Sequence, residues 1–264
     1  STTETTLTFN SGTTVEVTPS NIDGYTTPNA QTVTMDSDKQ MTFTYQKETV
    51  VEPTSMVGNF KFNTTQSNQK TAIAFHSNCF KKITIDDVDI PLAENNGITY
   101  YTFPNSGEHI GTFELGSEHA DAFKGQLFSF CNNMTSIDIP SGVTEIGKHA
   151  FLECTALSSV TIPNTVTKLS GFQGCSSLPY ITIPNSVTEI GNSAFPSCNF
   201  ITIHLPSGLT KIGESAFSEC QNLTGITIPD KVSEIGGNAF YGCISLSSIN
   251  VPFGAYFSGE GVFR

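Results

Sequence analysis

Apolar and polar positions recur at a fixed spacing along the second half of the chain. Each copy of this repeat holds a leucine and two isoleucines, such as Leu223, Ile226 and Ile228, and the isoleucines alternate with polar residues. Alternation with a period of two places both isoleucine side chains on one face of a β-strand. A proline ends the strand, and a second extended piece of the type Val-Thr-Glu-Ile-Gly follows it. Next comes Ala-Phe-x-x-Cys, in which Ala, Phe and Cys have the spacing of one face of a helical turn. The prolines and the cysteines both step by 21 to 23 residues: Pro140, Pro163, Pro184, Pro206, Pro229 and Pro252, and Cys131, Cys154, Cys175, Cys198, Cys220 and Cys243.

One repeat is too small to fold alone, because its few apolar side chains cannot offset the conformational entropy lost on ordering the chain. The copies must stack and share a core, which predicts a solenoid of about six coils. Two copies depart from the pattern. In residues 163–183 the Ile-Gly-x-x-Ala-Phe run is shortened to Leu169-Ser-Gly-Phe172, and in 184–205 one residue is missing after Cys198.

Two β-rich segments precede the repeats. Residues 1–50 hold the alternating runs TTLTF, TTVEV, QTVTM and QMTFTY between turn-rich stretches, which predicts a small β module. Residues 54–116 hold NFKFN, TAIAF, KKITIDDVDI, ITYYTF and HIGTFEL. An open solenoid end exposes unpaired strand edges, so we expect residues 54–116 to cap the solenoid formed by residues 117–264.

The repeat, best seen in residues 206–229, resembles the BspA-type leucine-rich repeats of bacterial, Bacteroides-like surface antigens. Five near-complete copies carry the resemblance over about half of the chain. It implies a mainly β protein in which N-terminal antiparallel β modules are followed by a right-handed leucine-rich repeat solenoid. It also implies a secreted or cell-surface protein, anchored to the outer membrane, with a role in adhesion.

Charge narrows the class of partner. The chain has 12 basic and 24 acidic residues and a net charge of -12. This is the wrong sign for neutralising a phosphate backbone, so we expect no nucleic acid partner. No apolar run is long enough to span a membrane, and the polar start at Ser1 lacks the features of a secretion signal. We expect that any export signal has been removed; whether a lipid anchor precedes Ser1 is left open.

The six repeated cysteines occupy one and the same position of the repeat. We expect inward-facing reduced thiols rather than disulfides, because a free cysteine behaves as a small buried apolar residue. The spacing offers no Cys-x-x-Cys pair of the kind that binds zinc. Cys79 lies outside the series, and no motif supports a nucleophilic pair with His76.

Two acidic clusters are candidate metal sites. One holds Glu108, His109, Glu118, His119 and Asp121, for which the alternative is a solvated polar loop. The other holds Asp86, Asp87 and Asp89, which lack the glycine and the distal glutamate of a calcium loop and favour an exposed turn. We therefore expect no metal and no cofactor.

The outward positions of the repeated strand form two rows on the concave sheet. One row holds Ser136, Ser159, Tyr180, Thr202, Gly225 and Ser248; the other holds Asp138, Thr161, Thr182, His204, Thr227 and Asn250. The rows suit a ladder of hydrogen-bonded hydroxyl groups along a sheet about 24 Å long. The functional interpretation is a shallow groove around Tyr180 and His204 that docks a glycan or a protein loop. The candidate ligand-binding residues are Tyr180, Thr182, Thr202, His204 and Thr227.

These patterns favour a binding protein over an enzyme, because no phosphate-binding loop, nucleophile elbow or zinc-protease motif occurs. We expect a monomeric adhesion protein with no catalytic residues, whose partner is a host or bacterial surface protein or a glycan. The alternative is a carbohydrate-binding accessory protein of a nutrient-uptake system.

Overall fold

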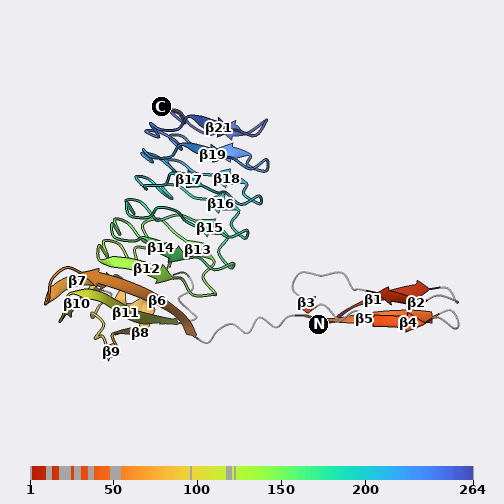
Figure 1. Ribbon diagram of the computed structural model, residues 1–264, viewed down its shortest axis with the longest axis horizontal. Coiled ribbons are helices and arrows are strands. Elements are labelled where there is room, and N and C mark those ends of the chain that lie inside the picture. The colour runs from red at the N-terminus through yellow and green to blue at the C-terminus, as the bar shows by residue number, and fades with distance from the viewer. Residues whose placement is uncertain are drawn as a thin grey trace. The chain divides into compact units, whose positions relative to one another are not determined.

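The computed structural model is almost entirely β-structure (Figure 1). It describes residues 55–95, 97–116, 121 and 123–263, and within the first fifty residues the backbone of the strands alone. The chain divides into two compact units, Ser1–Glu52 and Pro53–Arg264. No helix of the described ranges is both long and apolar enough to cross a membrane.

The first unit is antiparallel, as its alternating runs predict. Its outer strands pair with a long central one in the order β1-β5-β3, and β2 pairs with β4 in a separate ribbon. The bounds are β1 (Thr2–Phe9), β2 (Thr14–Val17), β3 (Tyr25–Thr26), β4 (Gln31–Thr34) and β5 (Lys39–Lys47).

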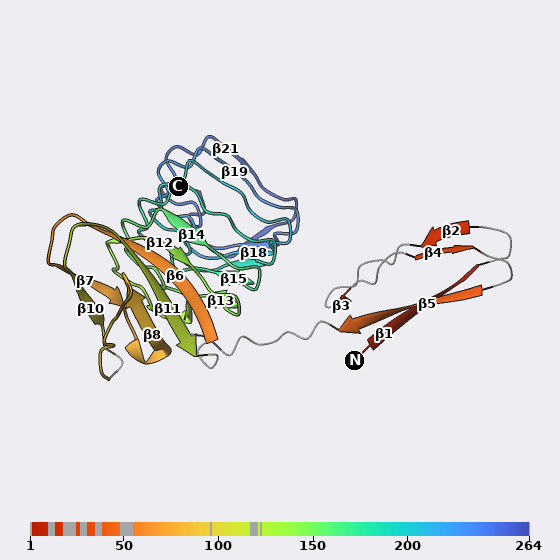
Figure 2. The same ribbon diagram turned by 60° about the horizontal axis from the view of Figure 1, so that its bottom comes forward.

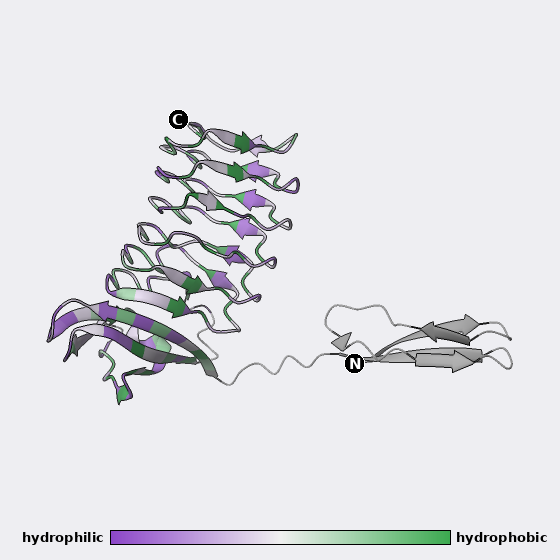
Figure 3. Ribbon diagram, in the orientation of Figure 1, coloured by the Kyte–Doolittle hydropathy of each residue, from purple (hydrophilic) through white to green (hydrophobic). Residues whose placement is uncertain are grey.

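The second unit begins with a sheet that covers the first coil of the solenoid. The sheet has the order β14-β12-β6-β11-β8-β9, so β6 pairs antiparallel with the first solenoid strand, β12, while β7 pairs with β10. Along β6 and β11, hydrophilic and hydrophobic residues alternate (Figure 3), and the inward side chains Phe60, Phe62 and Phe113 are buried. The bounds are β6 (Ser55–Thr64), β7 (Gln69–Ala74), the 3-10 turn η1 (Ser77–Cys79), β8 (Phe80–Ile85), β9 (Val88–Asp89), β10 (Thr99–Phe103) and β11 (Gly107–Gly116).

Five of the six coils contribute two short parallel strands each, and the coils stack one upon another (Figures 1 and 2). The Val-Thr-Glu-Ile-Gly pieces form one continuous sheet of β13 (Glu145–Ile146), β15 (Lys168–Leu169), β16 (Glu189–Ile190), β18 (Lys211–Ile212), β20 (Glu234–Ile235) and β22 (Tyr256–Phe257). The pieces before each proline form β12 (Met134–Asp138), β14 (Ser159–Thr161), β17 (Thr202–Ile203), β19 (Gly225–Thr227) and β21 (Ser248–Asn250). Ala-Phe-x-x-Cys forms turns in which an N–H bonds a carbonyl three residues earlier, as in Cys154 N to Phe151 O at 3.2 Å.

Two inward columns run through the core of the solenoid. One phenylalanine from each coil stacks on the next, with ring centroids 4.9 Å apart for Phe151 and Phe172 and 5.5 Å apart for Phe217 and Phe240. The cysteines lie beside this column as buried free thiols, as the repeat predicts. The stacked column is Phe128, Phe151, Phe172, Phe195, Phe217, Phe240 and Phe263. Coils are numbered below by their cysteines, from Cys131 in coil 1 to Cys243 in coil 6.

The sheet that carries the two predicted polar rows is interrupted, so the expectation of one continuous six-strand sheet is wrong. Coil 3 has no strand at residues 179–183, and the row divides into β12–β14 and β17–β19–β21. In coil 5, Thr224 N donates to Ile201 O at 3.0 Å in the preceding coil. Pro179 holds the matching position in coil 3 and has no N–H to donate, so the ladder stops there.

Candidate binding groove

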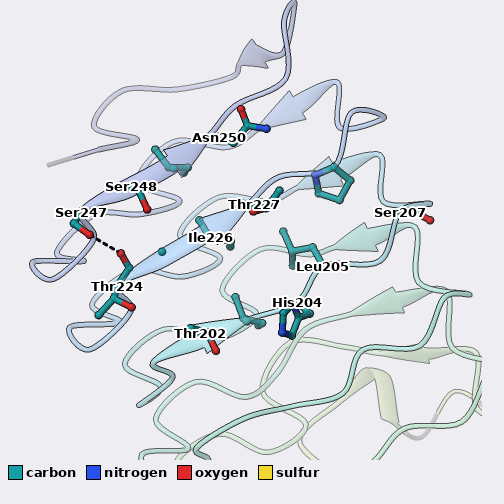
Figure 4. Close-up of a pocket in the computed structure, with 14 residues that line it drawn as sticks. Thr202, His204, Leu205, Ser207, Thr224, Ile226, Thr227, Ser247, Ser248 and Asn250 are labelled. Atoms are coloured by element: carbon teal, nitrogen blue, oxygen red, sulfur yellow. Dashed lines mark hydrogen bonds between the residues drawn. The ribbon is translucent and has the colours of Figure 1, made fainter.

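A groove of about 880 Å³ lies over β17, β19 and β21 in coils 4 to 6 (Figure 4). That volume falls within the range of small-ligand sites. None of its 14 described lining residues is Asp, Glu, Lys or Arg. The lining residues are Thr202, Ile203, His204, Leu205, Ser207, Thr224, Gly225, Ile226, Thr227, Pro229, Ser247, Ser248, Ile249 and Asn250.

The strand register builds the groove from equivalent positions of three coils. Ile203, Ile226 and Ile249 lie opposite one another in the parallel ladder, and the first two are buried. Their polar neighbours therefore point to the other face, where Thr227 lies opposite Asn250. The repeat thus converts one sequence pattern into aligned rows of exposed polar side chains on a hydrogen-bonded sheet.

A ladder of hydrogen-bonded hydroxyl groups borders the groove, one residue before the predicted rows. Thr224 Oγ1 donates to Ile201 O at 3.2 Å. Ser247 Oγ donates to Thr224 O at 3.0 Å (Figure 4). Ser158 makes the same bond to Thr135 O at 3.1 Å in coil 2. The prediction of a ladder within the rows themselves is therefore wrong, because position 224 and its equivalents make it instead.

The row side chains that line the groove keep their hydrogen-bonding groups unused. Thr202, His204, Thr227, Ser248 and Asn250 are all exposed. Within the described part of the chain, none of these five side chains has an intramolecular hydrogen-bond partner. Hydroxyl and carboxamide groups can each donate and accept. The rows thus present both kinds of group to anything that enters the groove.

Of the five candidate site residues, three lie in the groove and two do not. Thr202, His204 and Thr227 line it, whereas Tyr180 and Thr182 belong to the interrupted coil 3 and are not among its lining residues. Ser248 and Asn250 belong to the same rows by register and do line it. Leu205, Ser207 and Pro229 have no signal in the alternation pattern, because they follow the strands in the turns.

His109 does not lie in a solvated loop; it is a buried residue with both ring nitrogens engaged. Its Nδ1 lies 2.6 Å from Asp86 Oδ2, and its Nε2 lies 3.2 Å from Thr64 Oγ1 and 3.1 Å from Asn105 O. Asp86 Oδ1 accepts a hydrogen bond from Ile110 N at 3.1 Å. This contact joins the β8–β9 turn to β11, and it satisfies a buried polar group without a metal.

Glu108 and Asp89, from the two acidic clusters, each pair with a lysine. Glu108 lies 3.3 Å from Lys61, and Asp89 lies 2.9 Å from Lys82. Asp86 and Asp87 form the exposed two-residue turn of the β8–β9 hairpin, with φ of 49° and 62°, and positive φ at both central residues is what a type I′ turn requires. Across the described residues, no three His, Cys, Asp or Glu side chains are grouped closely enough to hold a metal. Glu118 and His119 lie outside the described residues.

Asp121, the last described member of the first cluster, forms a salt bridge with Lys124 at 2.6 Å.

Cys79 is partly buried, and its Sγ lies 3.8 Å from Asn78 Oδ1. Burial raises the pKa of the Cys79 thiol, which disfavours the thiolate that a cysteine nucleophile needs.

The repeats match a known family model. The model of the BspA type leucine rich repeat region matches in 6 copies over residues 57–171 and 170–264. The chain belongs to this family. The match begins at residue 57, within β6. The family model therefore covers the β-rich segment that precedes the coils as well as the coils of this BspA-type repeat protein.

Solved structures of other leucine-rich repeat proteins are similar over about half of this BspA-type chain. A protein from Bacteroides ovatus is 32% identical over 49% of this chain and 40% of that chain, with a TM-score of 0.41. The T. pallidum leucine rich repeat protein is 31% identical over 51% of this chain and 64% of that chain, with a TM-score of 0.47. A leucine rich cell surface protein from Faecalibacterium prausnitzii is 20% identical over 50% of this chain and 61% of that chain, with a TM-score of 0.25. No curated protein matches the chain.

Proposed function

We propose that this protein is a non-enzymatic binding module whose ligand, a protein or a glycan, occupies the groove over β17, β19 and β21. The observation that carries the proposal is the set of unused hydrogen-bonding side chains at Thr202, His204, Thr227, Ser248 and Asn250 in a groove of about 880 Å³. These side chains stand on a parallel sheet whose inward residues, such as Ile203 and Ile226, belong to the buried core. A rigid site loses little conformational entropy on binding, which favours affinity.

We also propose that the module is secreted or displayed at the bacterial cell surface and acts in adhesion. Membership of the BspA-type repeat family supports this part of the proposal. Antibody labelling of intact cells, with and without external protease, tests the location independently of the groove. Labelling only after cell lysis would contradict surface display.

The test of the groove uses the whole chain on immobilised extracellular-matrix proteins and on a glycan array. Thr227→Arg places a long charged side chain in the groove, and Thr182→Arg makes the same change in the same row outside it. Both threonines are exposed, so both variants are expected to fold. We expect the first to weaken binding by about tenfold or more and the second by less than about twofold.

Two results would count against this function. One is failure of the unmodified chain to bind any protein or glycan in the two panels. The other is equal binding by Thr227→Arg and the unmodified chain, which would move the site away from the groove.

A further inference from the structure

We infer that the ligand of the groove is a neutral oligosaccharide. The inference rests on the proposed function, because it names the ligand class for the same groove. It favours recognition of carbohydrate over recognition of a charged protein loop. It is carried by three properties of the groove: its lack of charge, its unused donors and acceptors, and its position on the face of a sheet.

The first property is the absence of charged side chains from the lining, although the whole chain carries a net charge of -12. Anionic ligands such as phosphate esters and acidic sugars are bound by Arg and Lys through charge-assisted hydrogen bonds. Cationic ligands call for carboxylates or an aromatic cage. Neither set is present among the described lining residues, so the groove matches a ligand without formal charge.

The second property is the type of polar group. Thr202, Thr227 and Ser248 each offer a hydroxyl, and Asn250 offers a carboxamide that both donates and accepts. A sugar hydroxyl also donates and accepts at once, so the two surfaces match group by group. Leu205 and Pro229 lie in the lining beside them and supply carbon surface for the C–H face of a pyranose ring.

The third property is the geometry of the rows. Equivalent side chains repeat at one strand spacing, about 4.8 Å, along the stack of coils, which suits a ligand that itself repeats short polar units. Thr227 lies opposite Asn250 across one such step. An extended peptide instead binds by adding a strand to a sheet edge, whereas this groove lies on the face of β17, β19 and β21, whose strands pair with one another.

The test is titration calorimetry of the whole chain with soluble gluco-, manno-, galacto- and xylo-oligosaccharides. Oligogalacturonate and a heparin oligosaccharide serve as charged probes. We expect at least one neutral series to bind, with an affinity that changes little between low and high salt because no ionic contact is made. Thr227→Val and Asn250→Ala are each expected to weaken binding about three- to tenfold, the loss of one hydrogen bond. Thr182→Val is the matched control and is expected to bind as the unmodified chain does.

The possible failures are distinguishable. Binding of a matrix protein that Thr227→Arg abolishes, with no neutral oligosaccharide bound, overturns the neutral-oligosaccharide inference and leaves the proposed function standing. Binding of the charged probes alone, abolished by high salt, also overturns it. If no protein and no glycan binds in the groove, both proposals fail. Thermal unfolding of each variant confirms that a loss of binding does not come from a loss of fold.

Discussion

The Sγ atom of Cys220 donates a hydrogen bond to the backbone carbonyl of Phe195, 3.1 Å away in the preceding coil. The same contact recurs between Cys198 and Phe172 at 3.1 Å. A neutral thiol therefore joins one coil to the next at a position where the repeat always places cysteine. Burial raises the pKa of Cys220 from its ordinary value of 9.0 to about 12 and that of Cys154 likewise to about 12.

These raised pKa values predict that the protein loses stability in alkaline solution. A raised pKa in the folded state means that the folded chain holds its thiol protons more tightly than the unfolded chain does. The stabilising contribution is complete below pH 9, and it is lost progressively as the pH rises from about 9 towards about 12. Urea unfolding between about pH 7.5 and pH 10.5 measures the decline.

Other groups titrate in the same range, so a control variant is required. The double variant Cys154→Ala, Cys220→Ala lacks two of the buried thiols and is expected to be less stable at neutral pH, because it leaves cavities. Its stability is expected to fall less steeply as the pH rises. If the free energy of unfolding falls equally steeply with pH in the two proteins, the thiols do not cause the loss of stability in alkaline solution.

A side chain at Gly213 is expected to destabilise the protein. A Cβ atom at this position would lie 2.6 Å from the backbone N of Asn192 in the coil below, whereas at Gly208 the nearest atom is Asn185 O at 3.6 Å. Gly213→Ala is therefore expected to cost about 1 to 3 kcal/mol through overpacking against backbone that cannot move independently. Gly208→Ala is the matched control and is expected to change the free energy of unfolding by less than about 0.5 kcal/mol. Chemical denaturation checks both, and equal effects would refute the close packing of coils at Gly213.

The sequence predicts the coils and their core because both follow from local periodicity. Cys220 and Phe217 recur in every copy at fixed offsets, so their inward positions need no knowledge of distant contacts. The contact of His109 with Asp86 is different, because these residues lie 23 positions apart and meet only through the pairing of β8 with β11. Asp86 is exposed, as the pattern predicts, but His109 is buried although no local feature of the sequence indicates it.

The position of the groove was predicted only in part, for a similar reason. The alternation pattern places Thr202 and Tyr180 in one row, and it treats all six coils as equal. Pro179 removes one hydrogen bond from the ladder and leaves coil 3 without a strand, so the row is interrupted between Thr161 and Thr202. The effect of one missing N–H on a sheet depends on which carbonyl lies opposite, and that is a property of the stacked coils.

A row of alternating charges runs along the continuous solenoid sheet. Glu189, Lys211 and Glu234 lie directly opposite one another on β16, β18 and β20, and Lys211 Nζ lies 3.0 Å from Glu234 Oε2. One coil earlier, Lys168 lies 3.2 Å from Glu189 in the same way. Opposite charges on facing strand positions stabilise a pair, and like charges destabilise it.

Reversing the central charge is therefore expected to destabilise the solenoid. Lys211→Glu sets three carboxylates side by side and is expected to cost about 1 kcal/mol at low salt, since the side chains are partly exposed to solvent. Adding Glu234→Lys returns a lysine beside the new glutamate and is expected to recover about half of that loss, because the contact with Glu189 stays repulsive. High salt is expected to shrink both differences, which separates a charge effect from a packing effect. Urea unfolding of the two single variants and the double variant at low and high salt measures the coupling, and additive effects would mean that the two positions act independently.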